Sequence, residues 1–182
     1  KCKVVFLSPH TENPEILLED IPEGLSKAVV PSSSPTVMQN LMVAEQVRGK
    51  PMDWKLSLSV DGSLKDLGGF KLIDRPTNDS KRLAFVALEI GKHTTGTMVY
   101  VNSASAAEKV ATLIYDGLDE KVNSSTAELN ELSESCKKII HPKFQLVKLV
   151  KRGVAFHYGN MPSIVREEIE RLFTNGEIKF LI

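Results

Sequence analysis

Side chains that suit the binding of an anion lie just after a short apolar run near residue 157. His157, Gly159 and Asn160 follow the apolar residues 154–156 directly. Pro162 comes next and can open a helix, because the N–H that proline lacks has no partner at that position anyway. The backbone N–H groups at the start of a helix attract anions such as phosphate. These residues are therefore placed where a phosphate could be held, although the spacing alone favours an ordinary strand-to-helix turn.

Residues 153–182 contain the elements that would position this loop. The run 154–156 is too short to cover a helix and predicts a buried strand, and residues 177–182 predict a second strand after the left-handed stop at Asn175-Gly176. Helical spacing between them gives an inner face of Ile164, Val165, Ile169, Leu172 and Phe173 and an outer face of Arg166, Glu167, Glu170 and Arg171. A strand–helix–strand unit of this length predicts parallel strands, and ligands of open parallel sheets bind beyond the strands' carboxyl ends.

A second junction between a strand and a helix lies at Asn102 and Ser103. Residues 97–101 are rich in β-branched side chains and predict a strand, and the alanine-rich residues 104–118 predict a helix. Ser103 is expected to cap this helix, and a capped helix start is also an anion site that could hold a phosphate of a nucleic acid. A purely capping role is the alternative, and the two roles are compatible. Residues 80–92 predict a further helix upstream.

Basic side chains gather at the end of the next helical region. Helices are predicted at 124–140 and at 144–150, and Lys148, Lys151 and Arg152 lie at the end of the second one. These three cations could face a nucleic acid. They could equally complement the negative end of a helix, and we favour that second interpretation.

The N-terminal part of the chain predicts short elements separated by a connector. An apolar run at 2–7 predicts a buried strand that ends at Ser8, His10 and Thr11. A short helix is predicted at 15–19, and the proline- and serine-rich residues 21–35 form the connector. A strand ending in a polar loop before a helix is again a candidate binding edge, with an ordinary turn as the alternative.

A β-hairpin is predicted after this connector. Residues 54–60 alternate strictly between apolar and polar side chains, and Asp61-Gly62 is a hairpin turn signal. Residues 64–73 would return antiparallel to them, with a break at Gly68-Gly69, and residues 37–47 are expected to be extended. Trp54 is expected to anchor the core of this hairpin rather than to stack on a nucleobase.

Composition limits the classes of protein that this chain can belong to. The 182 residues carry 23 basic and 23 acidic side chains, so any nucleic-acid site must be a local basic feature rather than a global one. Two cysteines make no disulfide framework and indicate a reducing compartment such as the cytoplasm. The four histidines are scattered and show no zinc pattern. No apolar run approaches the roughly 18–20 residues that a membrane span needs.

The stretch from Gly153 to Ile182 resembles the second RecA-like motor domain of superfamily 2 helicases, in the DExH branch that includes the Ski-type enzymes. In that family a strand ending in His and Gly precedes a helix with Arg and Glu, and Phe and Gly lead into an apolar strand. The matching residues are His157, Gly159, Arg166, Glu170, Phe173 and Gly176. The strand, Asn-Ser and alanine-rich helix at 97–118 are similar to motif IV of the same family.

This resemblance implies an α/β, RecA-like parallel-sheet fold for an incomplete second motor domain. Residues 1–35 would hold the end of the first RecA-like domain and the connector, 36–75 a β-rich linker, and 76–182 the front of the second domain. Ser8, His10 and Thr11 stand where motif III has Ser-Ala-Thr, and Ser8 matches that motif. Phe180 to Ile182 would then form an exposed apolar sheet edge, so self-association is expected.

The resemblance also implies a function. The parent would be an ATP- and Mg²⁺-dependent helicase acting on DNA or RNA, most often as a single strand. Backbone contacts are expected from Asn102, Ser103, His157, Gly159, Asn160 and Arg166. This chain has no G-x-x-x-x-G-K-[ST] phosphate loop, so we expect that it does not hydrolyse ATP by itself. The alternative is a non-catalytic α/β interaction module or a nucleotide-sugar binding domain.

Overall fold

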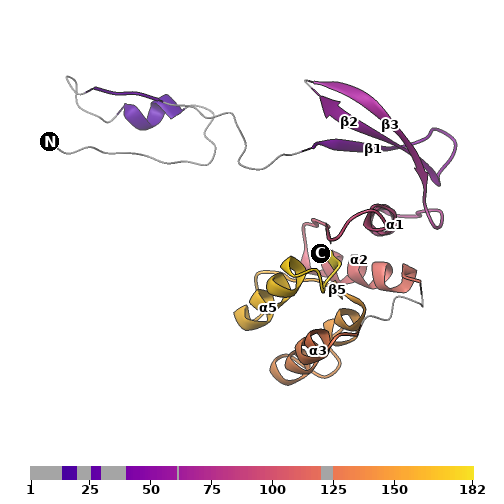
Figure 1. Cartoon of the computed structure of the whole chain (residues 1–182), viewed down its shortest axis with the longest axis vertical. Coiled ribbons are helices and arrows are strands. Elements are labelled where there is room, and N and C mark those ends of the chain that lie inside the picture. The colour runs from indigo at the N-terminus through magenta and orange to yellow at the C-terminus, as the bar shows by residue number, and fades with distance from the viewer. Residues whose placement is uncertain (1–13, 20–25, 30–39, 61, 120–124) are drawn as a thin grey trace. The chain divides into compact units, whose positions relative to one another are not determined.

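The computed structural model describes residues 14–19, 26–29, 40–60, 62–119 and 125–182 and divides the chain into two units, 1–40 and 41–182 (Figure 1). In the first unit, Pro14–Leu18 form a 3₁₀ helix (η1), which confirms the short helix predicted there. The strand predicted at 2–7, the candidate residues Ser8, His10 and Thr11, and most of the connector lie outside the described residues.

The second unit begins with an antiparallel sheet of three strands. β1 (Met42–Gln46) pairs with β2 (Asp53–Val60), and β2 pairs with β3 (Ser63–Lys71). Gly62 has φ +78°, the left-handed conformation that a tight hairpin turn requires, and Val60 is paired with Ser63 across it. The predicted hairpin is therefore confirmed, as is the extended conformation expected around β1.

Glycines in β3 produce a bulge rather than the expected break. Leu56 is paired with Gly68 and Ser57 with Asp66, so Leu67 is an extra residue in β3, and Gly68 has φ +108°. The chain continues as a strand beyond the bulge. Trp54 is only 7% exposed and stacks on the ring of Phe70 at 6.3 Å between centroids, which confirms it as a core anchor.

A short parallel sheet lies at the centre of the C-terminal part. β4 (Thr97–Met98) and β5 (Val154–Ala155) each pair in parallel with β6 (Phe180–Leu181), in the order β4-β6-β5. The predicted parallel arrangement of β5 and β6 is confirmed. The exposed edge expected at residues 180–182 is wrong, because β6 is the central strand and Phe180, Leu181 and Ile182 are all buried. The reason for expecting self-association through this strand is therefore removed.

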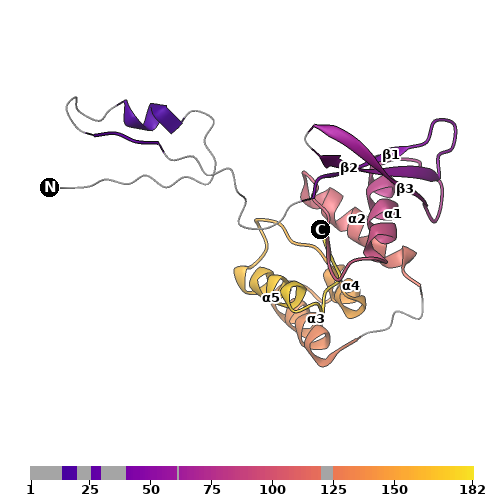
Figure 2. The same cartoon turned by 45° about the horizontal axis from the view of Figure 1, so that its top comes forward.

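Five α-helices accompany these sheets in the described part of the chain (Figure 2). Their bounds are α1 Asp79–Gly91, α2 Ala104–Gly117, α3 Ala127–Ile139, α4 Leu146–Leu149 and α5 Ser163–Thr174, and a 3₁₀ helix (η2) covers Val150–Arg152. All five confirm predicted helical regions. The first three are capped by side chains of Asn78, Ser103 and Thr126. α1 packs against α2, and α3 packs against α5.

The inner face predicted for α5 is largely confirmed. Val165, Ile169 and Leu172 are buried, and Phe173 is half-buried against the core. Ile164 is 63% exposed, so its predicted place on the inner face is wrong. At about 100° of rotation per residue, it lies roughly a quarter turn away from the buried stripe formed by Val165, Ile169 and Leu172. Gly176 has φ +82° and ends the helix as predicted.

These elements define an α/β architecture with one small antiparallel sheet and one short parallel sheet. Within the described residues, no helix is both long and apolar enough to cross a membrane.

Candidate functional site

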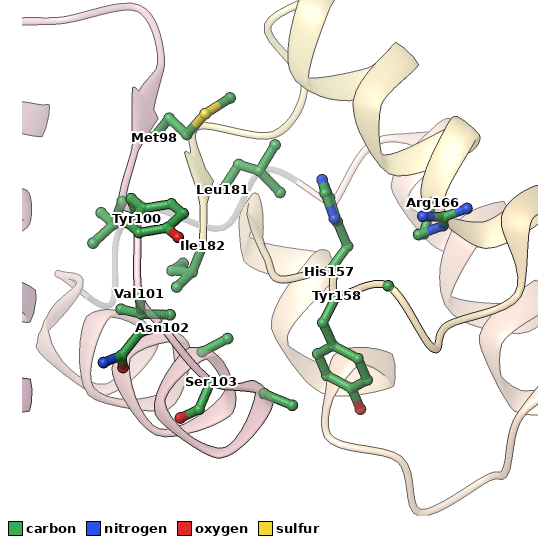
Figure 3. A pocket seen from close by; sticks show the side chains of 14 residues that line it. Met98, Tyr100, Val101, Asn102, Ser103, His157, Tyr158, Arg166, Leu181 and Ile182 are labelled. Carbon is green, nitrogen blue, oxygen red and sulfur yellow. The ribbon is translucent and has the colours of Figure 1, made fainter.

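A pocket of about 490 Å³ lies at the carboxyl ends of the three parallel strands (Figure 3). Five of the six predicted backbone-contact residues line it, four from two separate loops and one from α5: Asn102, Ser103, His157, Gly159 and Arg166. The sixth, Asn160, is exposed and does not line the pocket. The two junctions that the sequence singles out, 55 positions apart (157 − 102), therefore border the same space.

Backbone hydrogen bonds carry the parallel pairing up to the rim of this pocket. Val99 N donates to Leu181 O at 2.8 Å, and His157 N donates to Ile182 O at 3.0 Å. Both bonds lie beyond the last residues of β4 and β5. The loops that follow these two strands are thereby fixed on either side of Ile182, which explains why they face each other across the pocket.

The start of α2 forms one wall. Ser103 has an extended backbone, and its Oγ accepts a hydrogen bond from Ala106 N at 3.2 Å, which confirms Ser103 as the cap. A hydroxyl that accepts one hydrogen bond can still donate its own hydrogen. The first N–H groups of a helix have no partner inside the helix, and Ala104 lines the pocket at this point. This wall can therefore donate hydrogen bonds to an anion.

α5 contributes to the opposite wall in a different way from the one predicted. Pro162 is the residue before the helix, with φ −52° and ψ 132°, and it provides no side-chain cap. Ser163 and Ile164 do not line the pocket, so the first N–H groups of α5 do not open on it. Arg166, one turn further on, does line it, and its Nε is buried without a hydrogen-bond partner among the described residues.

Two interactions hold the loop between β5 and α5. The imidazole Nε2 of His157 lies 3.5 Å from a carboxylate oxygen of Glu170, on α5. The hydroxyl of Tyr158 donates to Glu108 on α2 at 3.0 Å. Burial, reinforced by this carboxylate, raises the pKa of Tyr158 above its usual value. The phenol therefore stays protonated and ties the loop to α2.

Two aromatic residues that line the pocket, Tyr100 and Tyr158, are missing from the sequence-based prediction. Tyr100 lies just beyond β4 and is 88% exposed. Residues 97–101 are nearly all apolar or β-branched, so no alternation of polar and apolar side chains could reveal which of them face solvent. Tyr158 stands inside the predicted loop, but its bond to Glu108 joins residues 50 positions apart, and no local pattern carries that information.

The basic cluster lies elsewhere, and for Arg152 the structure confirms the interpretation that we favoured, a contact with a helix end. The guanidinium of Arg152 donates to the carbonyl oxygens of Tyr115, Leu118 and Asp119 at 3.1, 3.2 and 2.7 Å, at the C-terminal end of α2. Lys148 Nζ lies 4.4 Å from the centre of the Tyr115 ring. None of the three basic residues of the cluster lines the pocket.

The described residues contain no group of three or more His, Cys, Asp or Glu side chains that could hold a metal ion. No protein-family model matches the chain, and a search of curated proteins finds no match either.

Proposed function

We propose that this chain is part of a superfamily 2 DExH helicase of the Ski type, and that its pocket contacts the sugar–phosphate backbone of a single strand of DNA or RNA. The observation that carries the proposal is that Ser103 and His157, with Asn102, Gly159 and Arg166, border one pocket. These are residues that the family resemblance singles out, and they come from two regions that are distant in sequence, the loop before α2 and the β5–α5 loop with the first turn of α5. Their shared position beyond parallel strand ends is the usual place for a ligand.

The chemistry of the pocket suits a phosphodiester. The start of α2 offers hydroxyl and backbone N–H donors. Arg166 offers a positive charge and an unpaired buried N–H, and an unpaired buried donor is costly unless a ligand or water satisfies it. With few cations present, binding is expected to be weak and independent of sequence.

We infer that the parallel sheet belongs to a RecA-like second motor domain. The strand–helix–strand unit β5-α5-β6, with its two parallel strands, supports this finer assignment. The residues present do not fit an ATP·Mg²⁺ site, because the sequence has no phosphate loop. Hydrolysis is therefore assigned to the parent motor, and no step of it to this chain.

The test uses a charge change at the cap of α2. Ser103→Asp keeps a good helix cap but puts a carboxylate where the phosphate would lie. We expect affinity for labelled oligodeoxythymidine and oligouridine, measured by fluorescence anisotropy at low salt, to fall by roughly tenfold. The salt dependence of wild-type binding should have a slope of about −0.7 for each phosphate contacted. The DNA and RNA arms show which strand the pocket prefers.

Asn78→Asp is the matched control. Asn78 caps α1 in the same way, with its side chain accepting from Lys81 N at 3.0 Å, and it does not line the pocket. The substitution adds the same charge at an equivalent position, so affinity should be almost unchanged. Equal loss of binding in both variants, or no binding by the wild type, would contradict the proposal.

A small-molecule site is the second candidate, because a volume of about 490 Å³ lies within the range of small-ligand pockets, roughly 300–1,000 Å³. The nucleotide-sugar alternative belongs to this class. Ligand length separates the two candidates. A path for a single strand should bind longer oligonucleotides more tightly, whereas a closed site for a nucleotide sugar should bind uridine diphosphate glucose at least as well as any oligonucleotide.

A further inference from the structure

Tyr100 is unusual among the tyrosines of this protein. The chain has three, and the other two have clear structural partners. Tyr115 lies under the cations of Lys148 and Arg152, and Tyr158 donates to Glu108 and stacks on Phe156 at 6.0 Å. Within the described residues, the side chain of Tyr100 makes no hydrogen bond or ring contact.

Tyr100 is also the most exposed large hydrophobic or aromatic side chain of the described part, at 88%, followed by Leu41 and Met98 at 68%. A tyrosine ring that stands free in water leaves the large apolar faces of its ring uncovered. No packing contact within the described ranges of the chain therefore explains why position 100 is a tyrosine.

The arrangement of the strands explains how the ring comes to face the pocket. Met98 is in register with Leu181, so their side chains lie on one face of the sheet, and Phe180 lies on the other, against Gly91 of α1. Tyr100 is two residues beyond Met98 and continues the first face. β4 is an edge strand, and that face is open over it, since both Met98 and Tyr100 are largely exposed.

Figure 3 shows the result, with Met98 and Tyr100 on one side of the pocket, His157 and Arg166 on the other, and Leu181 and Ile182 between them. The free ring stands two residues before Asn102, at the start of the wall that can bind phosphate. A ligand that is held there by a phosphate and also carries a flat apolar group can cover Tyr100. A nucleotide unit of a single strand has both parts.

We infer that Tyr100 is a base-stacking residue, whose ring packs on a nucleobase of the single strand that the pocket binds. The inference rests on the proposed function and adds a second kind of contact to it. Each base has a flat π face, so stacking on tyrosine raises affinity without selecting a sequence. Met98 borders the same face and adds an apolar, polarisable surface beside the ring.

The experiment compares an ordinary single strand with one that lacks bases. Wild type, Tyr100→Ala and Tyr100→Phe are titrated by anisotropy with labelled oligodeoxythymidine and with an abasic strand of the same length. Wild type should bind the ordinary strand roughly five- to tenfold more tightly than the abasic one, the lower part of the range for one stacked base. Tyr100→Ala should lose most of this preference, and Tyr100→Phe should keep it.

Ile164→Ala is the matched control, because Ile164 is another large exposed apolar residue, at 63%, and does not line the pocket. It should leave both affinities unchanged. If wild type binds ordinary and abasic strands equally, the stacking role is overturned while the phosphate site stands. If Tyr100→Ala keeps the preference for bases, the stacking residue is a different one. If wild type binds neither strand, the proposed function fails and the role of Tyr100 fails with it.

Discussion

The guanidinium of Arg152 joins two elements that are distant in sequence. It donates to three carbonyl oxygens at and just beyond the C-terminal end of α2, where no further helical turn supplies N–H donors. Arg152→Lys keeps the positive charge but cannot present the same fork of donors. We expect it to lower the free energy of unfolding by about 1–3 kcal/mol, as measured by urea denaturation.

Lys148→Ala is the comparison for Arg152. Lys148 belongs to the same cluster but contributes an exposed contact with the ring of Tyr115, expected to be worth about 0.5–1 kcal/mol. The lysine variant of Arg152 should therefore be the less stable of the two. An unchanged stability of Arg152→Lys would show that positive charge at this helix end matters and the geometry of the fork does not.

Cys136 has a thiol whose ionisation depends on folding. Burial raises its pKa to about 11 from an ordinary value of about 9. Since the folded protein holds the neutral thiol, this stabilisation is complete below about pH 9 and is lost as the pH rises through about 11. The free energy of unfolding should then fall by about 3 kcal/mol in addition to the effects of other groups.

Cys136→Ala isolates this contribution, because the other titrating groups are common to both proteins. The difference in unfolding free energy between wild type and Cys136→Ala, measured in urea with a reductant, should shift against the wild type between about pH 9 and pH 11. Parallel stability curves over that interval would show that the thiol ionises equally in the folded and unfolded states.

Helices were predictable because their signals are local. Apolar spacing indicates α1, α2, α3 and α5, and a polar side chain before the first turn marks the start of α2 at Ser103. Burial of a given position depends on what covers it, so Ile164 could be placed on a face but not recognised as exposed. Strands were predicted too long for a similar reason. Only two residues of the predicted strand 97–101 form β4, since the ladder extends only where β6 lies beside it.

The C-terminal end of α1 lies close to the central strand of the parallel sheet at Gly91. A Cβ at Gly91 would lie 2.4 Å from Cζ of the buried Phe180 ring. Replacing a helical glycine by alanine usually favours the helix by about 1 kcal/mol. Here we expect Gly91→Ala to destabilise the protein by about 1–3 kcal/mol, because the buried ring would have to shift to admit the new Cβ.

Gly117→Ala provides the matched comparison, since Gly117 is the last residue of α2 as Gly91 is of α1. Its new Cβ would meet Leu88 Cδ1 at 2.4 Å, the far end of a flexible side chain that can change rotamer. Thermal unfolding should therefore show a larger fall in Tm for Gly91→Ala. A rise in Tm for Gly91→Ala would mean that α1 does not press on Phe180.

At the scale of the whole molecule, the order of the parallel strands could not be predicted from the sequence. The unit β5-α5-β6 was predictable because its strands are linked by one helix. The insertion of β6 between β4 and β5 was not, because nothing local to 97–98 or 180–181 indicates that they pair. The candidate site was predicted in part for the same reason. The two loops could be identified one at a time, while their meeting around Ile182 depends on that strand order.

The order β4-β6-β5 also has a consequence for folding during translation. β4 and β5 pair with β6 and not with each other, and β6 follows both in the sequence. β4 and β5 therefore stay unpaired in the nascent chain until β6, which lies between them, has been synthesised. Met98 and Phe180 are 82 positions apart (180 − 98), so at about 5–20 residues per second this interval lasts roughly 4–16 s. During this interval β4 remains unpaired, so a chaperone that binds extended apolar segments could bind it.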